Sequence, residues 1–404
     1  MPRPLPAPRH AARTAASPYK KNDQQTTNQP DDHSRALPPM GRFVPELAVG
    51  LFHQEKDGPT SRTRTRTAAR PCFLPLASAG RRIDPLLNGA SVLRDDGIIL
   101  DHSRPVASRN GRLVLELRRE SRSDGLTFCV CNPITGDAAV LPELTGDDKP
   151  TDYGCALLTG DDLDPHTQRH HSTRFFRLLL IYNRPRFTAL RCYSSDTGRW
   201  ETEVTSSVKV SPRELHHIGR SVVRRGVAFW PLDHGALGVR LGDHDHLDRA
   251  VDVHLLPYYP TPHYWPEQRL LGVSPDDGRL FFMHFSIRAG LNVLTTKISY
   301  FDISGDDIHA GREVAPEHAV MMPQMNNMMW HRTTVKLRWV SEKSGVVLFT
   351  VQGGNGHDGT FALSLLDGTV EKVAAGEGDS WRNVVGLEMD GTAYLASLLP
   401  RGEN

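Results

Sequence analysis

The chain has 404 residues, of which 38% are hydrophobic and 24% are charged, and its mean hydropathy is -0.41. This composition can supply a core over most of the chain, and the net charge of +1 gives no overall field that would favour nucleic acid or a membrane surface. Five cysteines are an odd and sparse set for this length, which argues against a disulfide scaffold and is typical of a reducing compartment. We therefore expect a cytoplasmic or nuclear protein.

Residues 1–70 form the first region, which we expect to be disordered, basic and rich in Pro and Arg. The region carries 12 Lys and Arg against 6 Asp and Glu, whereas the rest of the chain carries 36 against 41. Residues 1–40 show no hydrophobic periodicity and too little apolar area to offset the entropy cost of ordering. An apolar island, GRFVPELAVGLFHQ (41–54), precedes the basic run SRTRTRTAAR (61–70). We interpret that run as a linker, with a nuclear localisation or phosphate-binding patch as the alternative.

From Cys72 onward, short apolar or alternating runs recur, and each is bounded by a Gly, Asp, Asn or Pro turn. Asn110-Gly111 separates two strand-like segments in RPVASRNGRLVLELRR, which is a strong hairpin signal. The stretch FCVCNPITGDAAVLPEL (128–144) repeats this scheme, with Pro133 and Gly136 in its turn. The later runs include FFRLLLIYN, FTALRCYSSDTGRWETEV, SVVRRGVAFWPLDHGALGVRL, RLLGVSPDDGRLFFMHF, VLTTKISYFDIS, TVKLRWVSEKSGVVLFTVQ, GTFALSLLDGTVEKV and RNVVGLEMDGTAYLASLL.

These runs predict roughly 20 short strands joined as hairpins, without intervening helices. Aromatic and β-branched residues concentrate in the runs, and no long segment has a convincing helical period. A single sandwich rarely holds so many strands, whereas a propeller does, because its blades are small sheets repeated around an axis. At about 45 residues per blade, we predict that residues 71–404 form an all-β, β-propeller-like domain of roughly six to seven degenerate blades.

An ordered series of segments carries a family resemblance. SRNGRLVLELRR followed by FCVCNPITGDAAVLPEL resembles the strand and "NP-x-T-G…LP" element of the F-box-associated domains of plant proteins. LRCYSSDTGRWETEV resembles the "Y-S-S-x-T-G-x-W" strand pair of that family, and SVVRRGVAFWPLDHGALGVRL resembles the strand pair of the next blade. GRFVPELAVGLFHQ and CFLPLASA resemble the junction after the F-box in grass members. The similarity covers about residues 41–400.

This resemblance implies a β-propeller receptor that holds a target protein while a helical F-box docks the Skp adaptor of an SCF ubiquitin ligase. Residues 1–40 contain no segment that resembles an F-box. ALPPMGRFVPEL has a Leu-Pro pair, but Pro38, Pro39 and Pro45 would interrupt a helix there. We therefore expect the receptor part without the adaptor-docking part, because the F-box has been lost or because the natural sequence is longer. The Skp adaptor is expected as a partner only if an F-box is present upstream.

Two cysteines, Cys129 and Cys131, lie at positions that project to the same face of a strand. A zinc site would need two more ligands, one of which could be Cys155 on a neighbouring strand. Small buried thiols are common core residues, so we interpret both cysteines as packing residues between blades.

Other segments suggest chemistry but are interpreted as loops. Gly354, Gly356 and Gly359 match a dinucleotide-binding pattern, but a strand follows them where a helix is needed, so a hairpin loop is expected. MMPQMNNMMW (321–330) is expected to be a long loop packed on the propeller, with a partner-contact loop as the alternative. The histidine-rich segments are also interpreted as polar loops: His170-His171, His216-His217, and GDHDHLD (242–248), where Asp243, His244, Asp245 and His246 are an alternative metal site.

No catalytic, cofactor-binding or metal-binding residue is assigned from the sequence. The hypothesis that follows is a non-enzymatic protein-binding module with an unidentified protein target, no cofactor, and neither nucleic acid nor a membrane as partner. One alternative is a truncated or non-functional family member. Another is a propeller hydrolase or lyase that uses His and Asp at the central channel. Fold alone does not decide among these, because function is carried by side chains grafted onto the fold.

Overall fold

The computed structural model describes part of the chain. The chain divides into two units, residues 1–36 and residues 37–404, and every residue described lies in the second unit. The described residues are 43–55, 71–77, 103–117, 125–144, Pro150, 152–162, 175–233, 235–240, 252–257, 269–274, 278–288, 293–302, 312–314, 320–321, 334–352, 358–375, 381–391 and Tyr394.

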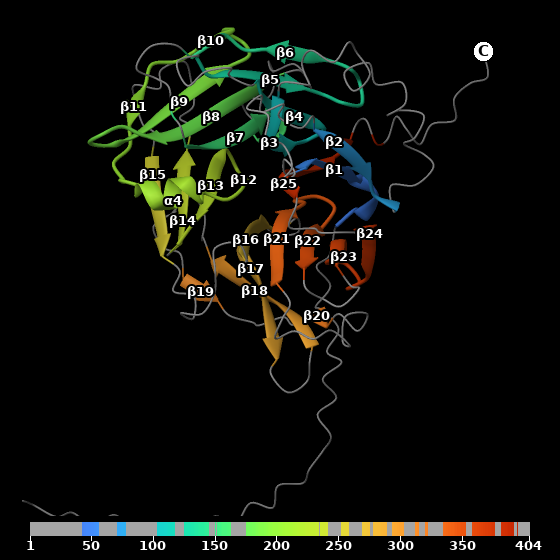
Figure 1. Cartoon of the computed structure of the whole chain (residues 1–404). Helices are drawn as coiled ribbons and strands as arrows, with labels where there is room; N and C mark the ends of the chain where they lie inside the picture. Colours follow the sequence, from blue (N-terminus) through green and yellow to red (C-terminus); the bar gives the residue numbers. More distant parts are fainter. Residues whose placement is uncertain are drawn as a thin grey trace, which may run out of the picture. The chain divides into compact units, whose positions relative to one another are not determined.

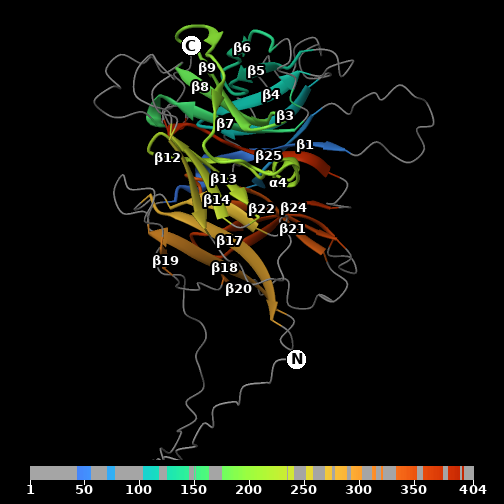
Figure 2. The same ribbon diagram turned by 90° about the vertical axis from the view of Figure 1, so that its left-hand side faces the viewer.

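The first sheet combines strands from distant parts of the chain. β1 (Ala48–Glu55), which follows the short 3-10 helix η1 (Pro45–Leu47), pairs with β2 (Cys72–Pro75) on one side. On its other side β1 pairs antiparallel with β25 (Trp381–Glu388), so the strand order is β2-β1-β25. Figure 1 shows the blue strands β1 and β2 beside the red strand β25, and Figure 2 shows β1 and β25 side by side from a direction turned by 90°.

The other sheets are each built from consecutive antiparallel strands. β3 (Ser103–Arg109), β4 (Arg112–Leu117), β5 (Thr127–Cys131) and β6 (Ala138–Val140) form the second sheet. The third contains β7 (Tyr153–Thr159), β8 (Phe176–Asn183), β9 (Thr188–Ser194), β10 (Arg199–Trp200) and β11 (Val204–Thr205). The fourth contains β12 (Val222–Arg224), β13 (Val227–Leu232), β14 (Gly235–Arg240) and β15 (Asp252–Pro257). The fifth contains β16 (Arg269–Val273), β17 (Leu280–Arg288), β18 (Val293–Asp302), β19 (Arg312–Val314) and β20 (Val320–Met321). The sixth contains β21 (Thr334–Val340), β22 (Val346–Gln352), β23 (Gly359–Ser364) and β24 (Val370–Ala375).

These sheets form a closed ring. The first strands of successive sheets contact one another in the order β3, β7, β12, β16 and β21, and β25 of the first sheet contacts both β21 and β3. In Figure 1 the sheets accordingly follow one another in the order of their colours. The described residues therefore form an all-β propeller of six blades, at the lower end of the range expected from the sequence.

The turn chemistry read from the sequence is confirmed at both quoted hairpins. Asn110 and Gly111 join β3 to β4 with φ angles of 47° and 73°, the two positive values that a type I′ turn requires. In the second hairpin the side-chain oxygen of Asn132 accepts from the backbone N–H of Ile134 at 2.9 Å, and Gly136 has a φ of 83°. Both turns therefore depend on residues that tolerate positive φ or that cap the backbone locally.

The interface between the first and second sheets is apolar. Cys129 and Cys131 of β5 are buried there, in one cluster with Leu115 of β4, Phe52 of β1 and Leu387 of β25. This placement confirms that the two thiols fill space between blades. Cys155, on β7, belongs to a different cluster, which joins the second, third and fourth sheets.

Two expectations about local structure were wrong. β1 lies within residues 1–70, which we expected to be disordered, because the apolar island at 41–54 completes a sheet with β25 instead of standing alone. His216 and His217 lie at the end of a short helix, α4 (Pro212–His216), and not in a polar loop. Ser211 and Glu214 form a capping box that starts this helix. None of the helices among the described residues is long and apolar enough to cross a membrane.

Candidate functional site at the axis

Charged residues gather where the innermost strands end. Arg109 is the last residue of β3, and Glu388 is the last residue of β25. Asp162 closes the 3-10 turn η3 (Gly160–Asp162) that follows β7, and Glu342 lies two residues beyond β21. Arg220 differs, since it lies two residues before β12 and bonds to Val106 within β3 and Val384 within β25. These five side chains form what we call the axial cluster. The ring brings them together because the innermost strands lie side by side around one axis.

Arg109 is the centre of the cluster. Its Nε and one terminal nitrogen donate to the two oxygens of Asp162, at 3.0 Å and 2.6 Å, in the bidentate geometry that suits a guanidinium. The other terminal nitrogen donates to Glu342. The side chains of Arg109 and Asp162 are only 13% and 4% exposed. Burial disfavours the charged guanidinium, but the two carboxylates outweigh it and hold the pKa of Arg109 above its usual value.

Glu342 connects blades that are not neighbours in the ring. One of its oxygens accepts from Arg109 of the second sheet, and the other accepts from the backbone N–H of Val223 in the fourth sheet, at 3.2 Å. The carbonyl of Val223 also accepts from Arg109, at 3.3 Å. Burial raises the pKa of Glu342 above its usual value in spite of the neighbouring guanidinium. The second, fourth and sixth sheets are therefore joined across the axis.

Glu388 ties the closing strand to the sixth sheet. Its Oε1 accepts from the backbone N–H groups of Lys343, at 3.1 Å, and Ser344, at 2.6 Å. Its backbone carbonyl accepts from the N–H of Gly111, at 2.8 Å, in the first turn of the second sheet. Burial raises the pKa of this carboxyl above its usual value, even though two backbone N–H groups stabilise the charged form.

Arg220 reaches across the ring to backbone carbonyls, whereas Arg109 bonds carboxylates. One terminal nitrogen donates to the carbonyl of Val106 on β3, and the other donates to the carbonyl of Val384 on β25, at 3.0 Å. Burial first, and then the charge of Arg104, lower the pKa of Arg220 to about 10. Arg104 itself is held by Glu116, at 2.5 Å, and by the hydroxyl of Tyr153, at 3.1 Å.

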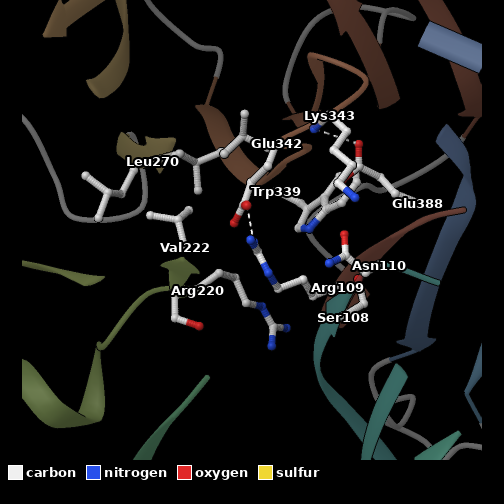
Figure 3. A pocket seen from close by; sticks show the side chains of 13 residues that line it. Ser108, Arg109, Asn110, Arg220, Val222, Leu270, Trp339, Glu342, Lys343 and Glu388 are labelled. Carbon is white, nitrogen blue, oxygen red and sulfur yellow. Dashed lines mark hydrogen bonds and ion pairs between the residues drawn. The ribbon is translucent and has the colours of Figure 1, made fainter. Parts of the chain in front are cut away.

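Two small cavities lie among these side chains. The larger, of about 30 Å³, is lined by the axial residues shown in Figure 3, including Arg109, Arg220 and Glu342, and by Trp339. A second cavity, of about 20 Å³, shares those four residues. A buried water needs roughly 10–15 Å³ of such space, so each cavity has room for one or two waters.

The hydroxyls beside the cavities are engaged with the backbone. Ser108 donates to the carbonyl of Gly386, and Ser221 donates to the carbonyl of Cys155, at 2.9 Å. A serine nucleophile needs a neighbouring base that takes its proton, and a carbonyl cannot do so. No histidine is among the described residues that line either cavity. The arrangement is therefore suited to joining blades and to holding water or a small ion.

The residues singled out in the sequence do not lie at this site. Cys129 and Cys131 are in the interface between the first two sheets, and His216 bonds Asp152 at 3.1 Å, with its side chain 65% exposed. Gly359 begins β23, which pairs with β22 as the expected hairpin. Within the described part of the chain, no group of three or more His, Cys, Asp or Glu could hold a metal ion. The following residues lie outside the described part: His170, His171, Gly354, Gly356, 242–248 and 322–330.

The axial cluster was missed because each member is one charged residue in a charged turn. Arg109 stands in the quoted SRNG motif, and Glu342 and Glu388 stand in the similar segments VSEKSG and LEMDG. A signal was present in these segments, since each places an Arg or Glu shortly before a turn glycine. The sequence does not show which of these turns share an axis.

No protein-family model matches the chain, and no curated protein matches it. Among solved structures, a functionally unknown protein from Desulfotomaculum acetoxidans is 10% identical, with a TM-score of 0.30 and 67% of this chain and 69% of that chain covered. A Penicillium chrysogenum alpha-L-arabinanase complexed with arabinobiose is 10% identical, with a TM-score of 0.34 and coverage of 72% and 84%. A Fusarium graminearum GH93 alpha-L-arabinofuranosidase is 9% identical, with a TM-score of 0.33 and coverage of 67% and 79%. Likenesses this distant carry no argument about function, and the propeller assignment rests on strand order and on contacts between sheets.

Proposed function

We propose that this chain is a protein-binding module, of the kind that F-box-associated domains provide as substrate receptors of ubiquitin ligases. Two features support the proposal: the series of segments that resembles F-box-associated domains in the same order along the chain, and the propeller architecture of the described residues. It assigns no chemical step to the chain.

The observation that carries the proposal is the filled axis. Arg109, Glu342 and Arg220 extend from three different sheets and bond across the ring. Their hydrogen bonds join different blades. Each of the two cavities between them has room for one or two waters. An axis occupied in this way favours recognition by the outer ends of the blades, where loops and turns can meet a protein partner.

The test is capture of a protein partner with variants at the two ends of the blades. Two exposed arginines mark the two ends of the blades. Arg225 lies in the turn between the first two strands of its blade, β12 and β13, and Arg186 lies in the turn between the second and third strands of its blade, β8 and β9. We expect charge reversal at one of them to weaken capture of a defined partner from plant-cell extract. Glu342→Gln, at the axis, should leave that capture unchanged.

Two measurements separate the proposal from its alternatives. Turnover of a glycoside or peptide substrate that is lost in Glu342→Gln would show an axial hydrolase and overturn the proposal. Equal loss of partner capture in every variant, with the fold intact by circular dichroism, would also contradict it. A pull-down with purified Skp adaptor then distinguishes a ligase subunit, which binds the adaptor, from a free binding module, which does not.

A further inference from the structure

Arg220 is a cation without a carboxylate partner among the described residues. Its two terminal nitrogens donate to the backbone carbonyls of Val106 and Val384. Carbonyl oxygens orient a guanidinium, but they carry only partial charge and do not neutralise it. This makes Arg220 different from Arg109 in the same cluster, which bonds two carboxylates.

The carboxylates that line the cavity with Arg220 are already engaged. Glu342 is bonded to Arg109 and to the N–H of Val223, and Glu388 accepts from two backbone N–H groups. On the other side, Glu116 accepts from Arg104 and from the hydroxyl of Tyr153. The lowered pKa of Arg220, with burial and Arg104 as its main causes, agrees with a positive charge that is not fully compensated.

Arg220 also faces open space. A guanidinium has five N–H donors, and the two carbonyls leave several of these donors available. Both axial cavities are lined by Arg220 together with Ser108, Ser221 and Trp339. In Figure 3 the guanidinium of Arg220 extends below Arg109, and no dashed line joins it to any other residue drawn.

We propose that Arg220 and the adjoining axial cavity form a binding site for a small monovalent anion, with chloride as the natural occupant. A single-atom anion is close to water in size, so it fits a cavity with room for one or two waters. The bound anion receives charge-assisted hydrogen bonds from Arg220, which bonds no carboxylate of its own among the described residues.

The first experiment measures thermal unfolding in sodium chloride and in sodium gluconate at equal ionic strength, so that general screening is the same in both. At chloride ten times above its dissociation constant, linkage raises the folding equilibrium constant roughly tenfold, and we expect a midpoint about 2 °C higher than in gluconate. Arg220→Gln should abolish this difference between the salts. Arg184→Gln is the matched control, because Arg184 is paired with Glu203 at 2.6 Å on the third sheet, and the difference should persist there.

The second experiment locates the anion directly. Bromide replaces chloride in crystals of the wild-type protein, and its anomalous signal should give a peak within hydrogen-bond distance of the guanidinium of Arg220. Absence of that peak overturns the proposal. So does a chloride effect of equal size in wild type and Arg220→Gln, because the anion would then act elsewhere. If Arg220→Gln does not fold, the bromide map of the wild type still decides.

Discussion

Between the first and second sheets the contacts are made by apolar side chains, two thiols among them, whereas at the axis they are made by charged groups. Leu115, Cys129 and Leu387 meet in the first case, and all are buried. Arg109 and Glu342 meet in the second. The apolar interface joins sheets that are neighbours in the ring. The charged axis also joins sheets that are not neighbours, through Glu342, and this difference determines how each region should respond to substitution.

Apolar burial has no direction, so the interface between sheets tolerates any residue of similar volume and polarity. The axial contacts depend on direction and on charge balance. A buried ion pair adds little net stability compared with apolar packing, yet the loss of one partner is costly because the other charge stays buried alone. The axis should therefore be the more sensitive region to single changes.

The largest effect is expected for Arg109→Met. This change leaves Asp162 and Glu342 without their shared cation and should destabilise the fold by about 3–5 kcal/mol. Urea unfolding monitored by tryptophan fluorescence measures it. Arg109→Lys keeps the charge but loses the bidentate geometry, so it should fall between wild type and Arg109→Met. A cost below about 1 kcal/mol for Arg109→Met would show that the axis does not hold the blades together.

A moderate effect is expected for Cys129→Ser in the apolar interface. A hydroxyl buried there without a partner costs about 1–3 kcal/mol, whereas Cys129→Ala loses only packing and should cost less. We therefore expect Cys129→Ala to have a higher free energy of unfolding than Cys129→Ser. The reverse order would mean that the thiol contributes a polar interaction instead of packing.

A smaller, pH-dependent effect is expected for Glu388→Gln. Because burial raises the folded-state pKa of Glu388, its contribution to stability is fully present below the unfolded-state value of about 4.3 and is lost as the pH rises through the folded-state pKa. Gln does not ionise, so the variant should gain stability relative to wild type as the pH rises from about 4.3. Unfolding free energies measured across this range test the sign.

Asp367 provides a control, because its pKa is shifted in the opposite direction from that of Glu388. Although burial acts against it, hydrogen bonds from Thr369 lower the pKa of Asp367, so its contribution is lost as the pH falls. Asp367→Asn should therefore lose stability relative to wild type at neutral pH and match it at low pH. A difference between Glu388→Gln and wild type that does not change with pH would contradict the account of the axis.

The smallest effect is expected for Lys343→Gln. The amine of Lys343 lies 3.3 Å from Asp161, but these side chains are 35% and 69% exposed. An exposed pair of this kind contributes about 0–1 kcal/mol, and the backbone N–H that Lys343 donates to Glu388 is unchanged. A loss as large as that of Arg109→Met would show that the charged network extends to the rim of the axis.

The hairpins and the architecture could be predicted from sequence because their signals are local. Asn110-Gly111 specifies its turn without reference to the rest of the chain. The capping box at Ser211 and Glu214, with Pro212 at the first helical position, was equally local and could have identified α4 before the structure was known.

The strand β1 and the axial cluster could not be predicted in this way. β1 has no hairpin partner before it, and its sheet is completed by β25 from the far end of the ring. Arg109 and Glu342 stand in different turns, and only the closed ring brings them within hydrogen-bond distance. Charges are common in turns, so their convergence depends on tertiary structure and leaves no local pattern.

The pairing of β1 with β25 has a consequence for folding during synthesis. β1 ends at Glu55 and β25 begins at Trp381. The edge of β1 that pairs with β25 therefore has no partner strand until the intervening blades have been synthesised. At a synthesis rate of roughly 5–20 residues per second, that interval is on the order of tens of seconds. Until then the first blade presents an unpaired strand edge, which is the state most open to pairing with another nascent chain. The emergence of β25, the last strand in the described part of the chain, therefore ends this exposure.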